Sequence, residues 1–164
     1  ETSIIIEHLQ RHHARTGHQL IPPDPDAAHD GRLWDRLSDL YVMTPMQAFT
    51  SDLLRAKQDR DPAGVTRAQE TLLMAYALMD GHLDGRSWIT GDRFTMADCA
   101  AAPALFYALA YVPLPSPHRQ LAAYVERLMA HPPVARTIDQ ARPFFKFFPG
   151  RAGLSRRYFD PDQA

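Results

Sequence analysis

The sequence has a single cysteine, Cys99, among its 164 residues, so no internal disulfide can form. This scarcity fits a reducing compartment, and we predict a cytoplasmic protein. The chain shows no secretory leader pattern and no polybasic block. It also lacks an excess of either charge, because 18 Lys and Arg face 19 Asp and Glu. We therefore expect neither nucleic acid nor an anionic membrane among its partners.

Strand patterns are scarce as well. No stretch alternates apolar and polar residues over a useful length, and no Asn-Gly pair marks a hairpin. Apolar residues recur instead at the spacing of three and four that is typical of helices. The expected helices cover 2–13, 27–58, 65–85, a run that begins after Thr95, 116–130 and a short segment ended by Arg142-Pro143. We predict an all-α bundle of about five helices preceded by one short helix.

Charged side chains are missing from residues 99–117, and this raises the question of a membrane span. Alanines and Pro103 dilute the run, and three prolines end it, so we favour a buried central helix. Thr95-Met96-Ala97-Asp98 immediately before it fits a capping box, with Asp where Glu or Gln is more usual. We read Thr95 and Asp98 as a structural device that starts this helix.

Several finer features of the helices can also be predicted. Pro45 should bend the helix over 27–58 near Tyr41, whose carbonyl loses its partner. Ser116 should cap the helix over 116–130, with Pro117 in its first turn. "GHQLIPPDPD", 17–26, reads as a linker in which Gly17 ends the first helix. The inner stripe expected for 27–58 consists of Leu33, Leu37, Leu40, Thr44 and Ala48.

Four motifs, in the same order along the chain, resemble the glutathione transferase family of bacterial type. "GDRFTMADCAAAPALFYA" is similar to the capped central helix of its C-terminal domain, and "RLWDRLSDLYVMTPMQ" to the first long helix of that domain. "AHPPVARTIDQARPFFKFFP" resembles the last helix and tail. "ETSIIIEHL" resembles the end of the thioredoxin-like N-terminal domain. The resemblance implies a remnant of that domain plus linker over 1–20 and the C-terminal helical domain over 21–164.

The resemblance also implies site residues. Glu1 and Thr2 match the family's Glu-Ser pair, which binds the γ-glutamyl end of glutathione, although Thr2 could simply cap a helix. Asp39 is a candidate partner for the glutathione amino group, within one chain or across a dimer. The family's thiol-activating residue and cis-proline lie in the N-terminal domain, so we expect no catalytic residue here. We interpret the sequence as the later part of a longer protein.

Tyr41, Met43 and Met46 are the residues we select for an apolar substrate pocket, since the first long helix faces the active cleft in the family. A place in the core or on the helix surface is the alternative for these residues and for Asp39, and for Met and aromatic residues at helical spacing it is the better supported one. The aromatic tail could likewise cover the cleft or pack on the bundle. Family members usually dimerise through their first two long helices, here about 28–58 and 64–85, which predicts a homodimer.

The intact protein is thus predicted to transfer the glutathione thiolate to a small apolar electrophile, with glutathione as co-substrate and no metal. His8 and His12 have a spacing that permits a metal site, but no carboxylate or Cys cluster completes it. Cys99 reads as a core residue, and Asp35-Arg36 as an ion pair beside Trp34. One alternative is a transferase-like scaffold without catalysis. A weaker one is a stand-alone helical protein that binds an apolar ligand without glutathione.

Overall fold

A computed structural model describes residues 1–13 and 19–158 and confirms the all-α fold. Over these residues the only β-pairing is an isolated bridge between Trp88 and Gly91. Gly17 and His18 lie outside the described residues. The α-helices are α1 (Thr2–His13), α2 (Pro25–Leu37), α3 (Thr44–Leu54), α4 (Pro62–His82), α5 (Met96–Tyr111), α6 (Arg119–Ala130) and α7 (Pro132–Ala141). None of these helices is long and apolar enough to cross a membrane.

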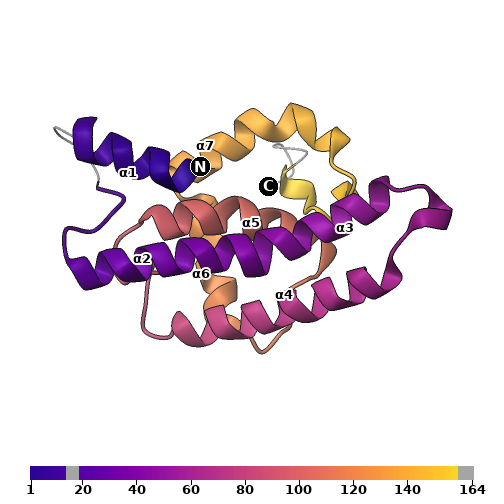
Figure 1. The fold of residues 1–164 in the computed structure, drawn as a ribbon, viewed down its shortest axis with the longest axis horizontal. Coiled ribbons are helices and arrows are strands. Elements are labelled where there is room, and N and C mark those ends of the chain that lie inside the picture. The colour runs from indigo at the N-terminus through magenta and orange to yellow at the C-terminus, as the bar shows by residue number, and fades with distance from the viewer. Residues whose placement is uncertain (14–18, 159–164) are drawn as a thin grey trace.

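One continuous rod is formed by α2, the π-helical turn η1 (Ser38–Met43) and α3, as Figure 1 shows. The perturbation expected near Tyr41 takes the form of this wide turn. Pro45 has no N–H to donate to the Tyr41 carbonyl. The backbone hydrogen bonds of this turn instead join residues five apart, which is the π-helical pattern. The Asp39 carbonyl accepts both the Thr44 N–H and the Thr44 hydroxyl, the latter at 2.9 Å.

The inner face of this rod is not the leucine stripe that the sequence suggested. Leu33 and Leu40 are 47% and 56% exposed, so that prediction was wrong. The buried residues recur at intervals of four: Trp34, Ser38, Val42 and Met46. They form the covered face of the rod, which contacts both α4 and α5, while Leu33 and Leu40 remain exposed.

The bundle is organised around α5, which Figure 1 shows in the middle of the molecule, between α4 and α7. Its alanines at 101, 104 and 108 are fully buried. Such short side chains let the neighbouring helices approach closely. Tyr76 of α4 is also fully buried, and its hydroxyl donates to the Val112 carbonyl at 3.2 Å, which ties α4 to the end of α5.

The start of α5 is held by the expected capping box. Asp98 has no exposed surface, and its Oδ2 accepts the backbone N–H of Thr95 at 2.8 Å. Its Oδ1 accepts the Ile89 N–H at 3.1 Å and the Tyr124 hydroxyl of α6 at 2.8 Å. The box therefore also joins α5 to the preceding loop and to α6. Gly91 in that loop has φ +115°, which favours glycine, and it closes a tight turn with Trp88.

The first turn of α6 is completed by another helix. We expected Ser116 to cap it, but α6 begins at Arg119, and the His118 side chain makes no capping bond. Instead, Asp80 of α4 accepts the Leu121 N–H at 2.8 Å. Asp80 thus satisfies one of the amides that a helix start leaves without an internal partner. Leu121, Val125 and Leu128 form the buried stripe of α6, as predicted.

The aromatic tail divides into two pairs because η3 (Arg142–Phe147) is a 3-10 helix. Side chains three residues apart lie above one another in such a helix. Phe145 is 2% exposed and Phe148 half-buried, and both pack on the bundle. Phe144 and Phe147 are 65% and 71% exposed. Of the two roles considered for the aromatic tail, packing on the bundle therefore applies to Phe145 and Phe148 only. The short turns η4 (Arg151–Gly153) and η5 (Arg156–Tyr158) follow.

Candidate functional site

A cluster of hydrogen-bonded polar residues lies where α1 begins beside α2. The Ser3 hydroxyl donates to Asp35 Oδ2 at 2.7 Å, and Arg36 donates to the Ser3 hydroxyl at 3.2 Å. Arg36 also donates through Nε and a terminal nitrogen to Asp35 Oδ2, at 3.1 and 3.0 Å. The same guanidinium donates to Asp39, one turn further along the rod. We call Ser3, Asp35, Arg36 and Asp39 the polar cluster.

Arg36 is the electrostatic centre of the polar cluster. Its hydrogen bond to Asp35 raises its pKa above the ordinary value, and the nearby charges of Asp35, Asp39 and Glu1 add to this shift. Arg36 is 49% exposed on its side chain, whereas Asp35 is buried. The buried Asp35 carboxylate thus holds the guanidinium on its protein side, and its other side faces solvent beside Glu1 and Asp39.

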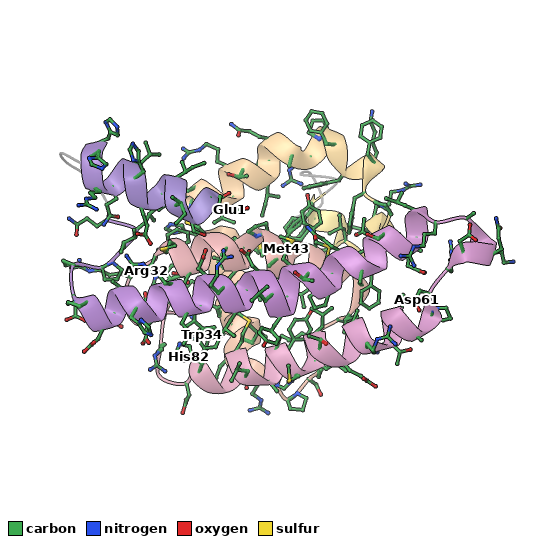
Figure 2. All side chains as sticks on the ribbon, viewed as in Figure 1. Glu1, Arg32, Trp34, Met43, Asp61 and His82 are labelled. Carbon is green, nitrogen blue, oxygen red and sulfur yellow. The ribbon has the colours of Figure 1, made fainter. Side chains whose placement is uncertain are left out.

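The polar cluster contains Asp39, one of the three predicted glutathione-binding residues, and lies beside the other two, Glu1 and Thr2, which precede Ser3 in the chain. Glu1 and Thr2 are exposed at the start of α1, Ser3 follows them, and Asp39 reaches the same guanidinium. A helix start also presents backbone amides without internal partners, which favours an anion. Figure 2 shows Glu1 on the α1 side of the rod. The arrangement can hold a zwitterion, with N–H donors for a carboxylate and carboxylates for an ammonium group.

Sequence reasoning selected Asp39 but missed the roles of Ser3 and Arg36 at this place. The Asp35–Arg36 ion pair forms as predicted, with 3.0 Å between the charged atoms. Trp34, however, does not cover it. Its ring instead contacts His82 of α4 at a tilt of 35°, with 4.1 Å between ring centroids, on the side of the rod that faces α4 in Figure 2. Only the contact of α1 with α2, which joins residues 32 positions apart, places Ser3 in the polar cluster.

Helix α1 itself is attached to the bundle mainly by polar contacts, since none of its twelve residues is buried in the described structure. Beyond Ser3, Glu7 pairs with Arg32 at 2.6 Å. The Gln10 side chain exchanges two hydrogen bonds with the Ile21 backbone, at 2.8 and 2.9 Å. Of the apolar side expected for α1, Ile6 packs near Ile21, whereas Ile5 and Leu9 are 57% and 51% exposed.

None of the four cavities described is lined by all three residues predicted for a substrate pocket. Tyr41 is 41% exposed and lines a groove of about 330 Å³ between the rod and α4. Met43 is half-buried against the main core, and Met46 is buried, with the Thr50 hydroxyl 3.7 Å from its sulfur. Tyr41 and Met43 are two residues apart on a helical rod, a spacing that turns side chains in different directions.

Cys99 and the histidines of α1 offer little to chemistry. Burial raises the pKa of the Cys99 thiol to about 11, and the neighbouring Asp98 charge adds to this, so burial outweighs its place in a first helical turn. His8 lies beside His12, with 4.7 Å between ring centroids. Within residues 1–13 and 19–158, no three His, Cys, Asp or Glu side chains are grouped so that they could hold a metal ion.

Comparison with known proteins gives one consistent family. Residues 62–127 match the family model for the glutathione S-transferase C-terminal domain. The chain is 36% identical over 52 residues to the glutathione S-transferase-like protein LUC7 of a Fusarium species, an alignment that covers 32% of this chain and 24% of that protein.

Two solved structures extend the similarity over most of the chain. A glutathione S-transferase of Methylobacterium radiotolerans, in complex with glutathione sulfonate, is 27% identical with a TM-score of 0.70, and the match covers 83% of this chain and 64% of that one. A glutathione S-transferase of Methylobacillus flagellatus with glutathione bound is 26% identical with a TM-score of 0.73, and the match covers 84% and 68%. This chain thus spans about two thirds of each structure and a quarter of LUC7.

Proposed function

Since this chain carries a C-terminal domain of the glutathione S-transferase family, we propose that the protein is a transferase that joins glutathione to a small apolar electrophile. The observation that carries this proposal is the polar cluster, which gathers Arg36, Asp39 and the exposed start of α1 at one place. The two similar structures, with glutathione or its sulfonate bound, support the same ligand.

In the proposed complex the γ-glutamyl end of glutathione lies at the start of α1. The Thr2 hydroxyl and the free amides of the first turn donate to its carboxylate, and Arg36 contributes positive charge. The carboxylates of Glu1 and Asp39 accept from its ammonium group. Asp35 does not touch the ligand but fixes Arg36 from the buried side.

The proposed reaction is attack by the glutathione thiolate on an electrophilic carbon. A sulfur–carbon bond forms, the leaving group departs with its electron pair, and the thiol proton goes to solvent. We assign thiol activation to none of the residues of this chain. Tyr41, Met43 and Met46 share none of the cavities described, so a joint electrophile pocket made by all three is not part of the proposal.

The test is glutathione binding and conjugation by the native gene product. We expect Thr2→Val to weaken glutathione binding about tenfold in calorimetric titration, because one hydroxyl donor to a carboxylate is lost. Thr66→Val, at an exposed threonine of α4, is the matched control and should bind as the parent does. Conjugation is followed with 1-chloro-2,4-dinitrobenzene, with and without glutathione.

The outcomes separate the hypotheses. Glutathione binding with conjugation supports a transferase. Binding without conjugation of several electrophiles favours the transferase-like scaffold. A native protein that binds no glutathione, or Thr2→Val and Thr66→Val proteins that bind alike, would contradict the proposed site.

We also propose that the protein is a homodimer through the outer face of the rod and α4. Tyr41, Met74 and Leu78 are exposed and line a groove between the rod and α4, and Leu33 and Leu40 are exposed on the same rod. The groove between them includes Ser38, whose buried hydroxyl finds no hydrogen-bond partner within the described residues. Apolar patches of this kind mark protein interfaces, and a two-fold axis would place the same face on both copies.

A charge in this face should separate the copies. Leu78→Glu places two carboxylates in the interface of each dimer, so we expect the dimer to dissociate about 100-fold more readily, or ~3 kcal/mol. Sedimentation equilibrium measures the change. Leu54→Glu is the control, because Leu54 is 72% exposed and lies outside the groove. A parent protein that is monomeric, or a Leu78→Glu protein as dimeric as the parent, would refute this interface.

A further inference from the structure

Two histidines lie one turn apart on the exposed side of α1. His8 and His12 are both exposed, and their rings lie with 4.7 Å between centroids at a tilt of 44°. Residues four apart in an α-helix project from the same face, so the helix itself holds these rings side by side. Both line a hollow of about 490 Å³, which Gln19, Ile21 and Arg32 border as well.

The separation of the two rings matches the geometry of a metal chelate. A divalent ion binds an imidazole nitrogen at about 2.0–2.1 Å, which places it about 3.2 Å from the ring centroid. Two such rings at bond angles of about 90–109° have centroids about 4.5–5.2 Å apart. The 4.7 Å between the His8 and His12 rings falls within this range. One ion can therefore bridge the pair with no change in the helix backbone, once each exposed ring turns a nitrogen toward it.

The donors of this pair select the kind of ion. Imidazole nitrogen suits Cu²⁺, Ni²⁺ and Zn²⁺, whereas Mg²⁺ and Ca²⁺ prefer oxygen. No third His, Cys, Asp or Glu is grouped with the pair in the part of the chain that the structure describes. His13 lies farther from His8, with 5.9 Å between centroids. Water would therefore fill the remaining positions around the ion.

The charges around the hollow permit a cation there. Arg32 and Glu7, which both line it, form an ion pair at 2.6 Å, so their charges largely cancel at a distance. Arg11 lines the hollow too, but it is exposed, and solvent and salt weaken its repulsion.

We propose that His8 and His12 together bind one divalent transition-metal ion and that this ion stabilises α1. None of the twelve α1 residues is buried in the described structure, and an isolated helix of this length is marginal in water. The ion reaches both rings only when the turn between them is helical, so it binds the ordered helix more tightly than the unfolded segment. The site shares no residue with the polar cluster and does not depend on the proposed transferase activity.

Calorimetric titration of the native protein with Zn²⁺ tests the binding. We expect one ion per chain in the tightest step, tighter binding of Cu²⁺, and no binding of Mg²⁺ at the same concentrations. His12→Asn should weaken Zn²⁺ binding at least about tenfold, because the gain from a second ligand on the same chain is lost. His29→Asn, at an exposed histidine of α2, is the matched control and should bind as the parent does.

Hydrogen exchange followed by mass spectrometry tests the effect on α1. Zn²⁺ at about 100 times its dissociation constant should slow exchange of the α1 amides at least about tenfold, and EDTA should reverse this. The amides of α4 serve as the internal reference and should not change. In the His12→Asn protein Zn²⁺ should leave α1 exchange unaffected, since one imidazole cannot link two positions of the helix.

Three results would overturn the proposal. One is an equal loss of Zn²⁺ affinity in His12→Asn and His29→Asn, since scattered single histidines would then hold the ion. Another is Mg²⁺ binding as tight as Zn²⁺ binding, because oxygen donors would then be responsible. The third is Zn²⁺ binding that leaves α1 exchange unchanged. None of these measurements involves glutathione, so such a result would not bear on the proposed transferase.

Discussion

Replacing Asp98 with alanine should lower the free energy of unfolding by about 4 kcal/mol. Four donors lose their acceptor at once: the backbone N–H groups of Ile89 and Thr95 and the hydroxyls of Thr95 and Tyr124. All lie in the buried interior, where water cannot replace the lost bonds. The loop before α5, the start of α5 and α6 would each be loosened by this single change.

Urea unfolding at pH 7 measures this loss, with Asp26→Ala as the control because Asp26 is exposed in the first turn of α2. The loss of stability in Asp98→Asn should lie between the losses in Asp98→Ala and Asp26→Ala. Its oxygen can still accept from Ile89 and Tyr124, but its amide group faces the donors of Thr95. A loss below about 1 kcal/mol for Asp98→Ala would show that the box contributes little beyond ordinary surface contacts.

The difference in folding stability between the parent and Asp98→Asn should also depend on pH. Burial raises the pKa of Asp98 above its ordinary value of 3.8, although its four hydrogen bonds oppose this. The folded state therefore binds the proton more tightly than the unfolded state does. The resulting stabilisation is complete below the ordinary pKa and is lost as pH rises through the folded value. The parent should gain stability relative to Asp98→Asn as pH is lowered toward 4.

A second large effect is expected from Asp35→Ala, and it should be local to α1. The change removes the acceptor of the Ser3 hydroxyl and the buried anchor of Arg36. Because none of the α1 residues is buried in the described structure, few apolar contacts compensate. We expect the amides of α1 to exchange with solvent about 30-fold faster, which corresponds to ~2 kcal/mol.

Hydrogen exchange followed by mass spectrometry resolves this effect, with α4 as the internal reference. Asp30→Ala, at an exposed carboxylate of the same helix α2, is the matched control. Asp35→Asn should be intermediate, since it keeps an acceptor for Ser3 but loses the charge that holds Arg36. Equal acceleration in α1 and α4 would mean that Asp35 supports the whole bundle and not the α1 contact.

Local signals in the sequence were enough for much of this fold. The capping box at Thr95 and Asp98 needs only residues three apart, and α4 has a long uninterrupted period, so both could be predicted. The inner face of the rod could not, because Leu33 and Leu40 lie outside, whereas a tryptophan, a serine and a carboxylate, Trp34, Ser38 and Asp35, are buried. Which face is covered depends on where α4 and α5 pack, and no local pattern states this.

The candidate site divides in the same way. Asp39 and the start of α1 followed from the family resemblance, but Ser3 and Arg36 enter through a contact between residues more than thirty positions apart.

The hydrogen bond from the Leu121 N–H of α6 to the Asp80 carboxylate of α4 makes these two helices interdependent. An isolated peptide with the sequence of α6 would begin with an amide open to water, whereas the docked segment starts with that amide satisfied by α4. The first turn of α6 is therefore stabilised by a tertiary contact with α4. A cut in the chain between residues 80 and 121 would separate acceptor from donor, so the cooperative unit of folding contains both helices.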